Sequence, residues 1–232
     1  MFIDDELYLF QYKDGYRYNS DSLVLYDFIS KLQPNGNVLD VGSGSGILGL
    51  LLKRDFSTIS LTQIEVQKRH QLLTSKSAEY NKLESEVICA DIREYNFDKK
   101  FDFIVSNPPF YHKGTQKSEN DSLKISRHSD SLPFEELTKT ISSKLKPRGS
   151  FVFCYDAKQI DTLLSILMQH KLKVNTMRLV YTKEENDASL VLIYARKSSK
   201  SLCRILPPLY MNSKEVEKIY LNSKTKSLLW EN

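Results

Sequence analysis

The sequence lacks the features that would direct it out of the cytosol or into a metal-binding class. Its start, from Met1 to Glu6, is acidic and carries no basic region followed by an apolar stretch, so we expect no secretory signal. Purely apolar runs extend for only a few residues, as at Leu50 to Leu52, whereas about 20 residues are needed to cross a bilayer. The three cysteines, Cys89, Cys154 and Cys203, are scattered and never spaced as a metal-binding pair. We therefore expect a cytoplasmic protein with ordinary thiols, no membrane partner and no metal.

The net charge of +4 is unevenly distributed along the chain. Residues 196–226 contain eight lysines and arginines but only two acids, Glu215 and Glu217. Such a segment is either a solvated surface or a contact for a polyanion such as a nucleic acid. Composition alone leaves both interpretations open.

Short apolar runs that alternate with helical segments indicate the fold class. We expect strands near residues 38–41, 59–65, 87–90, 101–106, 150–155, 174–181 and 189–195. Strands that alternate with helices form a mostly parallel sheet with helices on both faces. Only Lys183 to Asp187 separate the last two strands, so these must be antiparallel neighbours. The prediction is an α/β, Rossmann-like sheet of the seven-stranded methyltransferase type, mostly parallel with an antiparallel last strand.

A chain of 232 residues is long enough for one sizeable core, and we expect a single domain of this fold. Tyr8 to Tyr18 carries Asp14-Gly15 between aromatic residues, which is typical of a hairpin with a tight turn. A helix should begin at Ser20 and end before Pro34. The domain is divided into the N-terminal hairpin and helix (1–35), the catalytic core (36–196) and a basic C-terminal extension (197–232).

A glycine-rich turn follows the first core strand, from Asp40 to Gly46. Glycines allow positive φ and let a ligand lie against the bare backbone, while the next helix presents unpaired N–H groups. Gly44-x-Gly46-x-x-Gly49 formally fits the dinucleotide fingerprint, but counted from Gly42, directly after the strand, the third position is Ile47. Asp-x-Gly-x-Gly-x-Gly instead resembles the first motif of S-adenosylmethionine enzymes. The cofactor contacts predicted here are Asp40, Gly42, Ser43, Gly44 and Gly46.

Acids also follow the next two predicted strands. Glu65 ends the second strand, where a carboxylate can accept hydrogen bonds from both hydroxyls of a ribose. Asp91 follows the third strand, where it can accept from the adenine amine of the cofactor. A single acid at a strand end is more often a solvated turn residue or a helix cap. Three acids at successive strand ends favour the cofactor site.

The fourth strand ends in Asn107-Pro108-Pro109-Phe110, the most specific motif in the chain. The prolines hold the backbone rigid at the sheet edge. A nucleobase amine is a poor nucleophile because its lone pair is delocalised into the ring. The side-chain oxygen of Asn107 and the carbonyl of Pro108 can accept its two N–H groups and aim the lone pair at a methyl carbon. Phe110 can stack on a base that has left its neighbours, so we predict that these four residues are catalytic.

With these motifs the chain resembles a known family, the bacterial enzymes that methylate the adenine N6 amine next to the anticodon of a valine tRNA. The resemblance extends over nearly the whole length, and its last segments discriminate best. The matching segments are Asp14 to Ser22, the glycine-rich turn, Glu65, Asp91, Asn107 to Phe110, Ala188 to Lys197, Arg204 to Leu209 and Glu217 to Tyr220. The resemblance implies S-adenosyl-L-methionine as cofactor and tRNA as partner.

An RNA partner gives the basic residues a function. We expect phosphate contacts from Lys113, Lys117, Lys124 and Arg127 in a long irregular stretch, and from Arg196, Lys197 and Lys200. The chain departs from the family at Ser126-Arg127-His128-Ser129, where relatives have an acid after the arginine, so the orientation of Arg127 can differ. We expect the protein to act as a monomer.

Enzymes that methylate other substrates carry the same Asn-Pro-Pro-aromatic motif. A glutamine amide of a protein factor is also planar, but those enzymes carry a helical N-terminal domain, and only about 35 residues precede the first core strand here. The sequence also leaves guanine N2 in ribosomal RNA and adenine in DNA open as substrates. A non-catalytic nucleic-acid-binding module would be free to lose Asn107 or the glycines, yet all are present.

Overall fold

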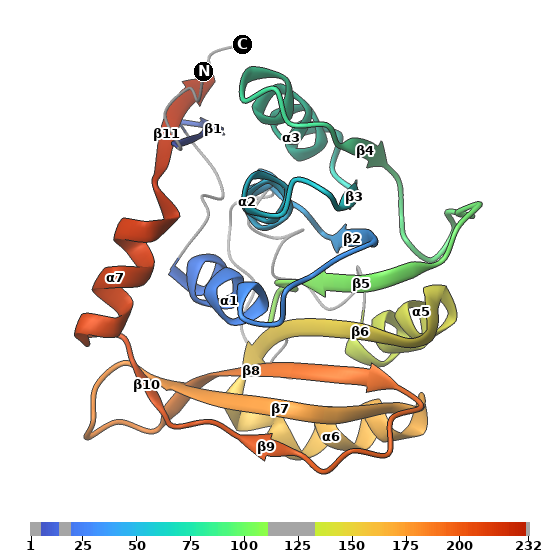
Figure 1. Cartoon of the computed structure of the whole chain (residues 1–232), viewed down its shortest axis with the longest axis vertical. Helices are drawn as coiled ribbons and strands as arrows, with labels where there is room; N and C mark the ends of the chain where they lie inside the picture. The colour runs from blue at the N-terminus through green and yellow to red at the C-terminus, as the bar shows by residue number, and fades with distance from the viewer. Residues whose placement is uncertain (1–5, 14–19, 111–132, 231–232) are drawn as a thin grey trace, which may run out of the picture.

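Helices cover both faces of a central sheet in the computed structural model of the chain, which describes residues 6–13, 20–110 and 133–230 (Figure 1). The strands of this sheet are β2 (Asn37–Val41), β3 (Ser60–Glu65), β4 (Glu86–Cys89), β5 (Phe101–Ser106), β6 (Leu145–Asp156), β7 (Leu172–Tyr181), β8 (Ala188–Lys197), β9 (Arg204–Ile205) and β10 (Leu209–Tyr210). Their order is β10-β7-β8-β6-β5-β2-β3-β4, with β9 also paired to β7.

Strand direction confirms the predicted fold class. Every paired neighbour in this sheet is parallel except β8, which runs antiparallel to both β6 and β7. All seven predicted core strands form, and the longest, β6, begins five residues earlier than its apolar run indicates. The apolar runs are continuous because successive side chains enter two different cores, as Val152 and Phe153 do on β6.

The helices are α1 (Ser20–Ser30), α2 (Ile47–Asp55), α3 (Lys68–Tyr80), α5 (Phe134–Lys144), α6 (Ile160–Gln169) and α7 (Lys214–Ser223), with the short 3₁₀ turn η1 (Ala157–Gln159). Apolar residues of α1, α2 and α7 pack on one face of the sheet, and those of α5 and α6 pack on the other. The start of α1 at Ser20 agrees with the sequence prediction. Within the described residues, no helix is both long and apolar enough to span a bilayer.

The first and last strands pair with each other outside the main sheet. β1 (Leu7–Tyr12) runs parallel to β11 (Thr225–Trp230), and β1 also binds α3 through Ser77, whose hydroxyl accepts from the Phe10 N–H at 3.0 Å. Sequence analysis predicted a hairpin from Tyr8 to Tyr18; its Asp14-Gly15 turn lies outside the described residues. The strand partner that the structure gives β1 is β11, at the other end of the chain.

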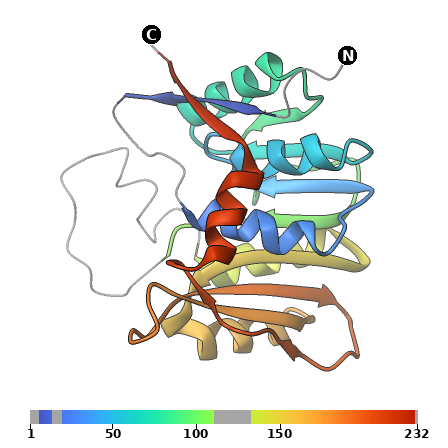
Figure 2. The same cartoon turned by 60° about the vertical axis from the view of Figure 1, so that its left-hand side comes forward.

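The C-terminal segment is folded onto the core rather than extended from it. Val216 and Ile219 of α7 are 1% and 5% exposed and join the core that contains α1. The guanidinium of Arg178 on β7 donates to both carboxylate oxygens of Glu215 at 2.7 and 2.8 Å. Figure 2 shows α7 crossing in front of α1 before the chain continues into β11. Because residues 197–232 are rich in charge, sequence analysis treated them only as a basic extension. Val216 and Ile219 are three positions apart, so they lie on one face of α7 and hold the helix on the core.

Candidate functional site

The parallel strands bring the predicted site residues to one edge of the sheet. β2, β3, β4 and β5 all end there, so the glycine-rich turn, Glu65, Asp91 and Asn107 follow neighbouring strands. A small pocket of about 30 Å³ opens at this edge. It is lined by Ser22, Asp40, Gly42, Ser43, Gly44, Ser45, Ile47, Leu48 and Asn107. Sequence analysis did not single out Ser22, Ser45, Ile47 or Leu48.

The glycine-rich turn combines open backbone with tight packing. Gly42, Gly44 and Gly46 have φ values of 68°, 57° and 83°, in the left-handed region that side chains rarely adopt. A Cβ atom on Gly42 would meet no heavy atom within 4 Å, so a ligand can lie directly against its backbone. A Cβ atom on Gly46 would lie 2.8 Å from Cγ2 of Thr74, so this glycine permits the turn to pack on α3.

Asp40 ties the turn to the helix behind it. Its carboxyl is buried and accepts a hydrogen bond from the Gly49 N–H at 2.9 Å. Burial raises the pKa of Asp40 to about 7; the Gly49 hydrogen bond partly offsets this, and the charge of Glu65 adds to it. Asp40 therefore both lines the pocket and holds α2 in place.

The raised pKa predicts a pH dependence of stability. In the unfolded chain an aspartate has a pKa of about 3.9. Between that value and about 7 the folded protein holds a proton on Asp40 that the unfolded chain has lost, so stability falls as pH rises through this window and levels off above it. The fall should approach about 1.4 kcal/mol per pH unit. Asp40→Asn keeps an oxygen for the Gly49 N–H but cannot ionise, so it should lose this contribution.

The measurement is the free energy of unfolding by urea for both proteins, at several pH values from 5 to 8. Other titrating groups contribute equally to both, so the difference between the two curves isolates Asp40. If the free energies of unfolding of the two proteins changed with pH in parallel, the raised pKa of Asp40 would be contradicted.

Glu65 braces the glycine-rich turn. One carboxylate oxygen accepts from the Gly44 N–H at 3.0 Å, and the other accepts from the Gln67 N–H at 2.9 Å. The side chain is almost fully buried. Each oxygen keeps a second acceptor position, which is compatible with the predicted ribose contact.

Asp91 is bound to an arginine that the sequence did not single out. Arg93 donates to it from its side chain at 2.5 to 3.0 Å and from its backbone N–H at 2.8 Å. Hydrogen bonds from Arg93 hold the pKa of Asp91 below its usual value, so this carboxyl is ionised at neutral pH. Arg93 also donates to Glu136 on α5 at 3.1 Å. The predicted contact between Asp91 and an adenine amine stays a prediction, and Arg93 competes for the same oxygens.

Asn107 is held from two sides at the end of β5. Its Nδ2 donates to the hydroxyl of Ser22 at 3.0 Å, and the Cys154 thiol on β6 donates to its Oδ1 at 3.0 Å. Pro108 is buried, whereas Pro109 and Phe110 are partly exposed. The Phe110 ring packs against Tyr155, with centroids 5.3 Å apart. The motif therefore places an amide oxygen and a ring at the same edge as the glycine-rich turn.

The chemistry of the pocket lining suits the methyl donor that the sequence predicts. The hydroxyls of Ser43 and Ser45 are buried with no hydrogen-bond partner among the described residues, so each is available to a polar ligand. They lie beside the open backbone of Gly42 and the carboxyl of Asp40. Hydroxyls, bare backbone and a carboxyl suit the zwitterionic amino acid and the sulfonium of S-adenosylmethionine.

The predicted RNA contacts that the structure describes do not lie at this edge. Lys113, Lys117, Lys124 and Arg127 lie outside the described residues. Arg196 and Lys197 end β8, whose antiparallel course places them at the edge opposite Asn107. The ammonium of Lys197 donates to the carbonyls of Ser142 and Leu145 at the C-terminal end of α5, a favourable place for a cation. Lys200 is exposed in the connection between β8 and β9.

Comparison with known sequences gives consistent matches. Residues 18–132 match the family model of the methyltransferase small domain. A tRNA1(Val) (adenine(37)-N6)-methyltransferase of Shewanella halifaxensis is 30% identical over 194 residues, which cover 80% of this chain and 78% of that protein. A protein of the same name from Aliivibrio salmonicida is 27% identical over 176 residues, 73% of either chain.

Solved structures share the fold at low identity. A predicted O-methyltransferase from Agrobacterium tumefaciens aligns with a TM-score of 0.68 and 16% identity, over 91% of this chain and 100% of the other. The Thermus thermophilus 16S rRNA N2 G1207 methyltransferase, solved with AdoMet and guanosine, aligns with a TM-score of 0.55 and 20% identity, over 80% of this chain and 45% of the other. These likenesses show a common methyltransferase fold.

Proposed function

This chain belongs to the family of tRNA1(Val) (adenine(37)-N6)-methyltransferases, and we therefore propose that it methylates the N6 amine of the adenine next to the anticodon of a valine tRNA. The methyl donor is S-adenosylmethionine. The observation that supports the substrate class best is the position of Asn107, whose amide lines the same pocket as the glycine-rich turn. An amide beside the donor pocket can accept a hydrogen bond from a planar amine and so prepare that amine to receive the methyl group.

The residues of the chain act by holding the acceptor rather than by attacking it. The bound donor supplies a methyl group on a positively charged sulfur, which leaves as a neutral thioether. Oδ1 of Asn107 and the carbonyl of Pro108 accept the two N–H groups of the adenine amine, and this draws the nitrogen toward a tetrahedral geometry. The nitrogen lone pair forms the new bond to carbon, and the nitrogen then loses a proton to water. Phe110 supplies an aromatic face for the base that has left its stack.

The test is the identity of the methylated nucleoside. Purified protein is incubated with S-adenosylmethionine and unmodified tRNA, and the digested RNA is analysed by mass spectrometry. We expect N6-methyladenosine in valine tRNA. A methyl group found instead on guanine of ribosomal RNA, on adenine of DNA or on a glutamine of a protein would overturn the proposed substrate. We also propose that the enzyme is a cytoplasmic monomer, which sedimentation of the purified protein can test.

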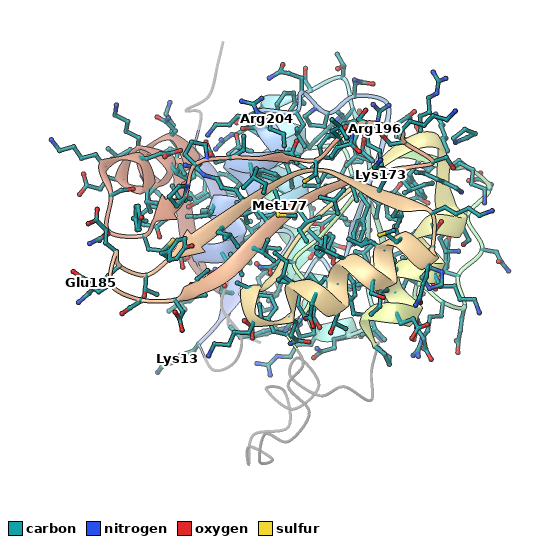
Figure 3. All side chains as sticks on the ribbon, turned by 90° about the horizontal axis from the view of Figure 1, so that it is seen from below. Lys13, Lys173, Met177, Glu185, Arg196 and Arg204 are labelled. Atoms are coloured by element: carbon teal, nitrogen blue, oxygen red, sulfur yellow. The ribbon has the colours of Figure 1, made fainter. Side chains whose placement is uncertain are left out.

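Unpaired cations at the end of β8 support a contact with the RNA backbone. Arg196 lies directly opposite Lys173 on β7, and Figure 3 labels both at this end of the sheet. Neither cation has an ion-pair partner among the described residues. Like charges directly opposite each other destabilise a sheet, and a bound phosphate would relieve that repulsion. Arg196 donates from Nε to the carbonyl of Arg148 at 3.2 Å and has further guanidinium N–H groups for a phosphate, whereas the single ammonium of Lys197 donates to two backbone carbonyls.

We therefore expect Arg196→Ala and Lys197→Ala to have different effects. Losing a phosphate contact should flatten the dependence of log affinity on log salt by about 0.7 to 0.9 for Arg196→Ala. Lys197→Ala should leave that slope unchanged and lower the melting temperature, because the end of α5 loses a cation. Filter binding of tRNA at several salt concentrations and thermal unfolding provide both numbers. Lys200→Ala, at an exposed position, tests the other predicted phosphate contact of this segment and should also flatten the slope. Equal slopes for wild type and Arg196→Ala would exclude Arg196 from the RNA contact.

A further inference from the structure

A thiol lies behind the amide of Asn107, where the proposed mechanism does not use it. Cys154 is 0% exposed in the middle of β6, and its sulfur is 3.0 Å from Oδ1 of Asn107. On the other side of the amide, Nδ2 donates to Ser22 on α1. We propose that Cys154 and Ser22 are positioning residues, which hold the amide of Asn107 with its oxygen directed to the substrate amine. This role rests on the proposed function, because it concerns the acceptor side of the same reaction.

The two contacts define one orientation of the amide. A side-chain amide can rotate by a half turn, which exchanges its oxygen and its NH₂ group with little change in shape. In the observed orientation the oxygen faces a donor and the NH₂ group faces an acceptor. After a half turn the NH₂ group would face the sulfur, which is a weak acceptor. The rotated state would also direct an N–H at the substrate amine, which needs an acceptor.

Burial keeps the thiol in the form that this role requires. It raises the pKa of Cys154 well above its usual value, and the charge of Asp21 acts in the same direction. The group therefore carries its proton at neutral pH and donates to Asn107. A thiol is a weak donor, and the carbonyl oxygen has a second lone pair, so Oδ1 can still accept from the substrate.

Cys154 also belongs to the apolar core beside Val152, and a purely packing role would need no hydrogen bond. Two variants separate these roles. Cys154→Ala and Cys154→Ser are of similar size and differ by one hydroxyl, so both lose similar packing but only serine keeps a donor. Cys154 does not line the pocket, so neither variant should alter cofactor affinity.

The experiment measures single-turnover methyl transfer to tRNA at saturating S-adenosylmethionine, together with the dissociation constant of the donor and the melting temperature. A hydrogen bond that orients a reacting group is worth about a three- to tenfold change in rate. We expect Cys154→Ala to slow transfer by that factor at unchanged donor affinity, and Cys154→Ser to restore most of the rate. Ser22→Ala should slow transfer as well.

Alanine and serine variants with equal rates, whether both are slow or both match the wild type, would overturn the positioning role while leaving the proposed function intact. A wild-type protein that methylates no tRNA amine would overturn the function and this role together. A slow alanine variant accompanied by rescue with serine has no explanation in packing, because the two side chains fill the core alike.

Discussion

Replacing Asn107 by alanine should abolish methyl transfer while leaving S-adenosylmethionine binding nearly intact. The predicted donor contacts lie mainly in the turn after β2, at the end of β3 and after β4, whereas Asn107 follows β5 and is the residue that we propose holds the acceptor amine. Removing one preorganised polar partner of a transition state typically slows a reaction by about 10²- to 10³-fold. The loss should appear in the rate of the chemical step, because the hydrogen bonds strengthen as the nitrogen becomes tetrahedral.

Single-turnover assays with tRNA measure the rate, and calorimetry measures donor affinity. Asn37→Ala is the matched control, because Asn37 begins β2 at the far end from the pocket and its side chain donates to the carbonyl of Lys100. That variant should keep its activity. Near-normal turnover by Asn107→Ala would contradict the amine-activation mechanism.

Replacing Gly42 by alanine should weaken S-adenosylmethionine binding without unfolding the protein. The added methyl group would meet no atom of the protein within 4 Å, so its structural cost is the left-handed backbone alone, about 1 to 2 kcal/mol. In the bound state the same methyl group would occupy the space in which the donor lies. Overpacking of this kind costs about 1 to 3 kcal/mol, which corresponds to roughly 5- to 150-fold in affinity.

Gly36→Ala is the control for backbone strain. Gly36 also has a positive φ, 70°, but its Cβ atom would meet the Asp102 side chain, away from the pocket. This variant should lose more stability than Gly42→Ala, because a clash with Asp102 adds to the backbone strain, and it should keep the donor affinity that Gly42→Ala weakens. Titration calorimetry and thermal unfolding of both variants measure the two effects. Unchanged affinity in Gly42→Ala would show that the donor does not approach this backbone.

Local patterns in the sequence were sufficient to predict the seven core strands and the motifs that the structure brings to one edge of the sheet. Apolar runs and helical periodicity depend on residues a few positions apart, and the glycine-rich turn and Asn-Pro-Pro-Phe are continuous in the chain. In a parallel sheet, strand ends meet at one edge, so residues after β2 to β5 converge once the order is known. Roles that depend on a partner elsewhere could not be predicted in this way. The hydrogen bonds of Glu65 to the turn and the pairing of Asp91 with Arg93 are examples.

The sequence by itself determined the class of fold, the cofactor motif and the residue that we propose activates the amine, because each is encoded within a short segment. Only the tertiary structure decided which residues surround that amide. Ser22 and Cys154 are 85 and 47 positions from Asn107, and their contacts arise from the packing of α1 and β6 against the end of β5. The same is true of the pairing of β1 with β11, which joins the two ends of the chain. Such contacts depend on how whole helices and strands pack together, and this packing cannot be predicted from the local periodicity of the sequence.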